Sequence, residues 1–169
     1  MTTTWFFLTC QISVIAYALV SGVFMTFSDF IMRSLGGAKT AAGVEVMQVI
    51  NQKVYKSLFI VLLLGMAAAS PFLIGYAYVQ LTGTAAMLLM TGGGIYLGGV
   101  FVVSLLFNVP MNHKLETFDH SGSAAATYWQ KTYLTRWVFW NHIRALASGA
   151  AAVCFLAACV LLAQEAGIS

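Results

Sequence analysis

The stretch WVFWNHIRAL, residues 137–146, places Asn141, His142 and Arg144 at the start of a long apolar segment. A histidine can accept a proton near neutral pH, whereas asparagine and arginine can stabilise a negative charge that develops on oxygen. Hydrocarbon disfavours all three side chains, so they need polar partners or a function. The stretch therefore predicts a site for proton transfer and oxyanion stabilisation. Its structural alternatives are interhelical hydrogen bonds and snorkelling of Arg144 to the lipid headgroups.

Two amides interrupt the apolar face of a helix predicted over residues 41–56. At about 100° per residue, this face carries six side chains: Val44, Met47, Gln48, Asn51, Val54 and Tyr55. Buried amides must be hydrogen-bonded or they destabilise the fold. Gln48 and Asn51 are therefore expected either to tie this helix to a neighbour or to bind a ligand.

Polar residues also stand at the ends of two apolar segments. Asp29 lies near the end of the first segment, where it could orient a catalytic histidine or pair with Arg33. Asn108 and Asn112 flank Pro110, which is predicted to end the third helix and to free backbone carbonyls. These asparagines are candidates either for capping those carbonyls or for binding a substrate.

The composition indicates an integral membrane protein. The 169 residues are 60% hydrophobic and 8% charged, whereas soluble domains carry roughly 25% charged residues. Four apolar segments are long enough to cross the bilayer as helices, and none alternates with period two: about 5–31, 58–81, 85–109 and 138–163. The prediction is one all-α transmembrane domain over 1–169. It is a four-helix bundle in which the first segment is retained as an anchor because it lacks a basic leader region.

The basic residues predict which side each connection occupies. Seven of the eight lie in the connections between helices one and two or three and four: Arg33, Lys39, Lys53, Lys56, Lys114, Lys131 and Arg136. Basic connections face the cytoplasm, which puts both termini on the non-cytoplasmic side. Short interfacial helices are expected in both connections, with Tyr128, Trp129, Tyr133 and Trp137 at the membrane interface. The net charge of +3 has no large cluster that would indicate nucleic-acid binding.

Glycine and cysteine give structural predictions. Gly94 and Gly98 form a small-xxx-small pair that permits close helix packing, and Pro71 is expected to kink the second helix. The three cysteines form no CxxC pair and are expected to pack in apolar surroundings.

No cofactor is predicted, although a metal remains open. The candidate ligands show neither HxxxH nor HxH spacing: His113, His120, His142, Asp29 and Asp119.

With the predicted topology, the polar side chains named above meet at the cytoplasmic end of the bundle. Their convergence predicts a polar pocket between the helices.

The sequences FSDFIMRSL, MQVIN, NVPMN and WVFWNHIRA occur in this order over about residues 22–148. In this the chain resembles the anthrone-oxygenase-like family of small four-helix membrane proteins, many of which have no assigned activity. The resemblance implies a four-helix membrane fold. As in the best-known fungal members, it also implies oxidation of anthrones to anthraquinones by O2 without a recognised organic cofactor. Carried over by motif, the polar positions of the family are Gln48, Asn51, Asn108, Asn112, Trp137, Asn141 and Arg144.

Three functional hypotheses follow. In the enzyme hypothesis His142 is the base, oriented by Asp29, and the oxyanion is stabilised by Asn141, Asn112 and Arg144. Trp137 and Trp140 stack on a flat hydrophobic substrate, which also contacts Gln48, Asn51 and Asn108. The alternative is a non-catalytic accessory subunit of a larger membrane complex, and homo-oligomerisation stays open. A carrier or channel is disfavoured because the outer half of the helices offers no polar route.

The topology is testable with reporters at the C-terminus. Alkaline phosphatase fused there is expected to be active, and green fluorescent protein fused there is expected to be dark, because both termini are predicted outside the cytoplasm. A fluorescent fusion with an inactive phosphatase would contradict the topology.

Overall fold

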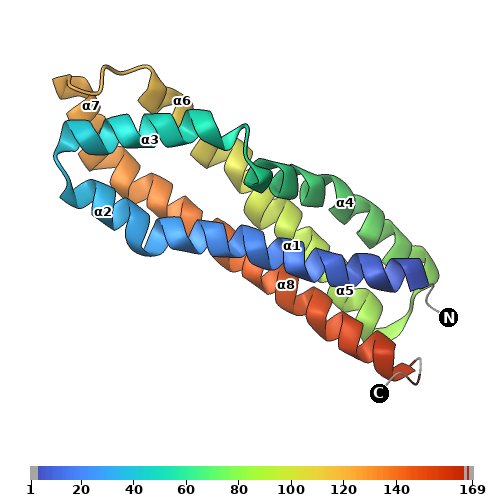
Figure 1. Ribbon diagram of the computed structural model, residues 1–169. Coiled ribbons are helices and arrows are strands. Elements are labelled where there is room, and N and C mark those ends of the chain that lie inside the picture. The colour runs from blue at the N-terminus through green and yellow to red at the C-terminus, as the bar shows by residue number, and fades with distance from the viewer. Residues whose placement is uncertain (1–3, 166, 168–169) are drawn as a thin grey trace.

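Four helical spans form an all-α bundle of a multi-pass integral membrane protein (Figure 1). The computed structural model describes residues 4–165 and 167, and no strand occurs among them. The spans are Thr4–Gly37, Leu58–Gln80, Gly83–Glu116 and Ser123–Glu165. The predicted fold class is confirmed. Three of the spans, however, are longer than the apolar segments that predicted them.

The first, third and fourth spans each change between α-helix and π-helix along their length, whereas the second does not. The first consists of α1 (Thr4–Thr26), the π-helix η1 (Phe27–Ile31) and α2 (Met32–Gly37). The second is α4 (Leu58–Gln80), which continues through Pro71 and is preceded by α3 (Thr40–Val54). The third consists of α5 (Gly83–Tyr96), η2 (Leu97–Val102), η3 (Ser104–Asn108) and α6 (Val109–Glu116). The fourth consists of α7 (Ser123–Tyr128), η4 (Trp129–Trp137) and α8 (Val138–Glu165).

The length of the spans divides the molecule into two parts. Spans of 34, 34 and 43 residues measure about 50 to 65 Å at 1.5 Å per residue, whereas the hydrocarbon layer is about 30 Å thick. They therefore project beyond the bilayer at the end opposite to the start of α1 and the end of α8 (Figure 1). α3 packs on this projecting part. Hydropathy missed the extensions because it reports contact with hydrocarbon rather than the length of a helix.

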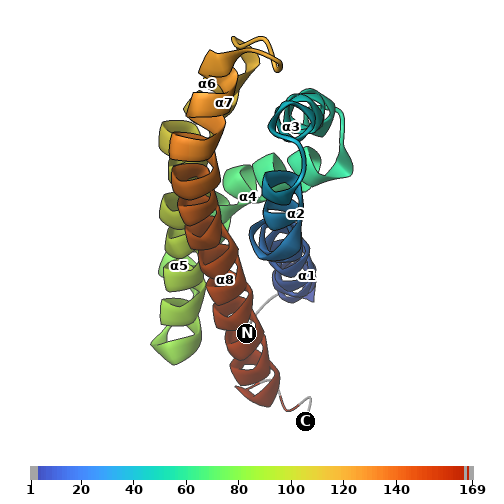
Figure 2. The ribbon, with the colours of Figure 1, turned by 90° about the vertical axis from the view of Figure 1, so that its left-hand side faces the viewer.

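Helix α8 organises the membrane part by packing between α1 and α5 (Figure 2). Two reciprocal hydrogen bonds join α1 and α8: Ser21 Oγ donates to the Ala145 carbonyl and Ser148 Oγ to the Tyr17 carbonyl, each at 2.8 Å. The membrane core packs around the buried rings of Tyr17, Tyr96 and Phe155, together with Cys10 and Cys159.

Pro110 does not end the third helix, so this prediction is wrong. α6 begins at Val109, and Pro110 lies in its first turn, where a missing backbone N–H costs little. The preceding π-helix η3 has already shifted the hydrogen-bond register, so the chain continues as helix to Glu116.

The aromatic residues before α8 are part of the protein core and do not form an interfacial belt. Trp129, Tyr133 and Trp137 are buried. Their rings stack with centroid separations of 5.3 and 5.5 Å and interplanar angles of 18° and 14°. Spacing of four residues places them on one face, which packs against Met47 of α3 and Leu115 of α6. The interface prediction is therefore wrong for these three rings; Tyr128 is partly buried.

The close helix contacts involve other glycines than the predicted pair. Gly94 and Gly98 are exposed, and a Cβ added at either position would meet no atom within 4 Å. A Cβ at Gly92 would lie 2.9 Å from Cys154 Cβ, and a Cβ at Gly99 would lie 2.5 Å from Ala147 Cβ. The sequence could not distinguish these faces because glycines occupy both sides of the helix.

Replacing Gly99 tests the packing of η2 on α8. Gly99→Ala is expected to cost about 1–3 kcal/mol of unfolding free energy, because Ala147 Cβ is fixed to its backbone and cannot move aside. The matched variant Gly94→Ala is expected to leave stability unchanged or slightly higher, because alanine favours helix. Thermal unfolding in detergent measures both. Equal loss in the two variants would contradict the packing.

Candidate functional site

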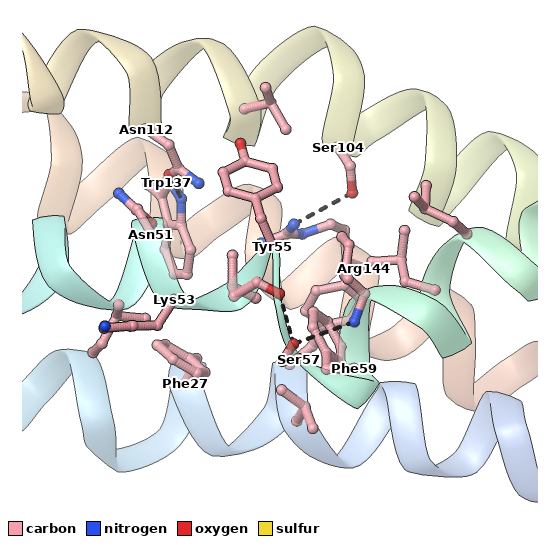
Figure 3. Close-up of a pocket in the computed structure, with 18 of the residues that line it drawn as sticks. Phe27, Asn51, Lys53, Tyr55, Ser57, Phe59, Ser104, Asn112, Trp137 and Arg144 are labelled. Atoms are coloured by element: carbon pink, nitrogen blue, oxygen red, sulfur yellow. Dashed lines mark hydrogen bonds between the residues drawn. The ribbon is translucent and has the colours of Figure 1, made fainter.

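A cavity of about 640 Å³ lies where the membrane part meets the projecting part (Figure 3). Its walls come from α1 and η1, from α3, α4 and their connection, from the third span, and from the region where η4 meets α8. Most of the lining is apolar, including Phe24, Phe27, Leu63 and Phe101. The polar or amphipathic lining side chains are Asn51, Lys53, Tyr55, Ser57, Ser104, Asn112, His113, Trp137 and Arg144.

Arg144 is the dominant electrostatic feature of this cavity. Only 7% of its surface is exposed, yet it forms no salt bridge among the described residues. Nη2 donates to Asn141 Oδ1 at 2.6 Å and Nη1 to Ser104 Oγ at 3.3 Å, whereas Nε has no acceptor. The guanidinium carbon lies 4.2 Å from the centre of the Phe24 ring, which is a cation–π contact.

A buried cation without a counterion is costly, because low polarity strengthens every uncompensated charge. The partners of Arg144 are an amide oxygen, a hydroxyl and aromatic faces, all of them neutral. The free Nε–H and the open cavity together favour a ligand oxygen that carries negative charge.

Asn141 holds the guanidinium in place. Its Nδ2 donates to the Phe24 carbonyl at 2.7 Å and to Ser28 Oγ at 2.6 Å, which orients its oxygen toward Arg144. The Phe24 carbonyl lies three residues before η1, near the point where the helical hydrogen-bond register changes. Asn141 is buried but does not line the cavity, so it acts through Arg144.

Asn112 fixes one wall of the cavity. Its Oδ1 accepts hydrogen bonds from Tyr133 Oη at 2.7 Å and from Trp137 Nε1 at 2.6 Å. Both donors are otherwise buried among apolar groups, so one oxygen satisfies two polar atoms. The Trp137 ring is thereby held at the edge of the cavity (Figure 3).

Two other predicted amides donate hydrogen bonds to backbone carbonyls of neighbouring segments. Gln48 Nε2 donates to the carbonyls of Leu115 and Phe118, each at 2.9 Å, and caps the end of α6 against α3. Asn108 Nδ2 donates to the Trp137 carbonyl at 3.1 Å, at the end of η4. Neither lines the cavity.

Asn51 offers a second donor to the cavity. It is 3% exposed, lines the wall, and its Nδ2 has no acceptor among the described residues. Asn51 and Arg144 come from α3 and α8, which lie nearly a hundred positions apart in the chain. The fold thus brings two buried, unpaired N–H donors into the wall of one apolar cavity.

Three further predicted site residues do not line the cavity. Asp29 and His142 are exposed, and neither lines it. His142 points outward because it lies about 100° around the helix from Asn141, which points inward. Trp140 stacks on Phe107 at 3.7 Å with an interplanar angle of 3°, also outside the lining. The geometry does not support His142 as the base or Asp29 as its orienting partner.

Sequence reasoning missed Ser104 and did not place His113 at the cavity. Ser104 is the single polar side chain between Tyr96 and Asn108, so its position four residues before Asn108 was a usable signal. His113, a candidate metal ligand in the sequence, lines the cavity, and its Nδ1 lies 3.8 Å from Glu116 Oε2.

The candidate metal ligands are dispersed in the part of the chain that the structure describes, which holds no group of three or more His, Cys, Asp or Glu side chains. Asp119 and His120 lie in the exposed turn after α6. Hydrogen bonds from the Ser121 amide and hydroxyl, at 3.0 and 2.9 Å, lower the pKa of Asp119. Metal binding by this protein stays an untested possibility from the sequence.

Comparison with known families places this geometry in context. Residues 46–154, more than half of the chain, match the family described as Anthrone oxygenase. The chain belongs to the anthrone oxygenase family. No curated protein and no solved structure matches it. The family match covers all nine polar or amphipathic lining residues: Asn51, Lys53, Tyr55, Ser57, Ser104, Asn112, His113, Trp137 and Arg144. Membership in the anthrone oxygenase family supports an oxygenase-like role.

Removing the Asn112 acceptor tests the wall of the site. Asn112→Ala leaves two donors of Tyr133 and Trp137 unpaired and is expected to cost about 1–3 kcal/mol of unfolding free energy. The exposed variant Lys114→Gln on the same helix should change stability by less than about 0.5 kcal/mol. Chemical unfolding followed by circular dichroism measures both. An unchanged Asn112→Ala protein would show that this oxygen does not support the wall.

Proposed function

We propose that this protein is a membrane-embedded oxygenase that oxidises a flat, hydrophobic aromatic ketone of the anthrone type with O2. The observation that carries the proposal is the buried guanidinium of Arg144, which has a free Nε–H and no counterion at the wall of an apolar cavity. The basic residues of the connections support a cytoplasmic location for this end of the bundle.

The cavity fits the chemical properties of such a substrate. A volume of about 640 Å³ lies within the usual range for small-molecule sites, and the walls offer Phe24, Phe27 and Trp137 to flat rings. An anthrone carries an acidic CH2 opposite its carbonyl, because loss of a proton gives an aromatic enolate with the charge on oxygen. Arg144 and Asn51 are the donors that would stabilise this oxygen.

The oxidation divides into balanced steps. A base removes one proton from the CH2, and the electron pair moves to the carbonyl oxygen beside Arg144. The enolate transfers one electron to O2, and the two radicals combine to form a carbon–oxygen bond. The resulting peroxide takes up a proton. The second hydrogen of the same carbon then leaves as a proton, the O–O bond breaks, and water departs as the new carbonyl forms. One anthrone and one O2 give one anthraquinone and one water.

His113 is the imidazole that we assign to the first proton transfer. It lines the cavity, in contrast to His142, and Glu116 is close enough to orient it. Its exposed side chain connects the cavity with water, which gives the proton a route out.

Oxygen consumption with anthrone tests the role of Arg144. Arg144→Gln is expected to lower kcat/KM by about 10²–10³, because it removes a charge that stabilises the enolate oxygen in the transition state. Lys56→Gln, an exposed change outside the cavity, is the matched control and should keep the wild-type rate. Equal activity of the Arg144→Gln and wild-type proteins would refute the proposed role.

The same assay separates the two histidines. His113→Ala should lose activity and the acidic limb of the pH profile, whereas His142→Ala should retain both. Loss of activity in His142→Ala but not in His113→Ala would identify His142 as the base instead.

A further inference from the structure

We infer that the cavity is also a receptor for apolar organic anions, carboxylates or phenolates, that bind with their charged oxygen at Arg144 without any reaction. The inference rests on the proposed function in one respect: the same guanidinium receives the ligand oxygen. It goes beyond that function because it concerns ligands that already carry a negative charge. The proposed substrate enters neutral and becomes charged during the reaction, whereas these ligands are charged when they bind.

The first support is the incomplete neutralisation of Arg144. A guanidinium keeps its proton in proteins, so it stays positive when buried. Asn141 and Ser104 satisfy two of its nitrogens without contributing negative charge, and Nε remains free. An anion at Nε would supply both the missing hydrogen bond and the missing charge, where low polarity makes both strong.

The second support is the charge distribution of the lining. Among the described residues that form the cavity there is no Asp or Glu, whereas Lys53 and His113 add basic groups near its mouth. Glu116, which does not line the cavity, lies with its Oε2 3.8 Å from His113 Nδ1. The cavity therefore repels cations and attracts a single negative charge.

The third support is the apolar volume that surrounds the guanidinium. Phe24, Phe27 and Phe101 form its inner walls. Leu64 of α4 and Leu105 of η3 line the cavity and are also exposed on membrane-spanning helices, which opens it toward the lipid. The fitting ligand has one anionic oxygen group on an apolar body. Aromatic acids and fatty acids share this chemistry.

Equilibrium titration distinguishes charge from shape. Purified wild-type protein in neutral detergent is titrated with anthracene-9-carboxylate and with anthracene-9-carboxamide, its neutral counterpart, using the quenching of tryptophan fluorescence. The carboxylate is expected to bind at least about tenfold more tightly, because it forms a charge-assisted hydrogen bond to the buried guanidinium. Dodecanoate and dodecanol form the second pair and show whether aliphatic acids also fit. A carboxylate preference in either pair supports the inference, and its absence in both overturns it.

Variants connect the preference to Arg144. Arg144→Gln should bind the carboxylate and its neutral counterpart equally. Because loss of a buried arginine can prevent folding, Ser104→Asp is the second variant: it keeps the guanidinium but supplies an internal carboxylate, and it should also abolish the preference. Lys56→Gln should retain it. A preference that persists in a folded Arg144→Gln or Ser104→Asp protein would overturn the inference.

Binding and turnover fail independently. Carboxylate-selective binding without anthrone-dependent oxygen uptake would refute the proposed function and leave the receptor intact. Oxygen uptake without carboxylate selectivity would refute the receptor and leave the proposed function intact.

Discussion

The hydrogen bond between Arg144 Nη2 and Asn141 Oδ1 holds a positive charge in an apolar cavity without neutralising it. The amide is itself fixed, because its nitrogen donates to the Phe24 carbonyl and to Ser28 Oγ. A carboxylate in place of this amide would have formed an internal ion pair and left nothing for a ligand to gain. The neutral partner keeps the cation fixed in position but available, which is the condition for electrostatic preorganisation.

The π-helical segments make this arrangement possible. Each of the three long spans contains such a segment near the cavity, where the backbone hydrogen-bond register changes. The carbonyls of Phe24 and Trp137, at the borders of η1 and η4, accept hydrogen bonds from Asn141 and Asn108. On the opposite side Gln48 ties α3 to the end of α6, which positions Asn51 at the cavity. Irregular backbone and buried amides therefore stabilise one another in this bundle.

The membrane architecture follows from composition, because hydrocarbon demands long apolar helices. The burial of Asn51, Asn141 and Arg144 was accessible from helical periodicity, since each shares a face with apolar neighbours. The hydrogen-bond partners of the amides could not be predicted from the sequence. Asn141 and Asn108 donate to the carbonyls of Phe24 and Trp137, at the borders of π-helices, and Gln48 donates to carbonyls at the end of α6; no residue type marks those positions.

The position of His142 outside the cavity has a geometric cause. One end of the bundle holds Asn141, His142 and Arg144, but these residues do not all lie on the same face of the helix. Because each residue turns the helix by about 100°, His142 points outward whereas Asn141 points inward. Ser104 was missed because a lone serine in an apolar helix usually bonds its own backbone; here it accepts a hydrogen bond from Arg144.

The central claim is that Arg144 stabilises an anionic ligand oxygen, and the absorption spectrum of anthrone bound in the absence of O2 tests it most directly. Without O2 the enolate cannot react further, so its absorption reports the charge on the bound ligand. The account predicts that the enolate band appears on the wild-type protein at a pH where free anthrone is neutral, and that it is absent with Arg144→Gln. Neutral anthrone bound to the wild-type protein, or an equal enolate band with the variant, would contradict it.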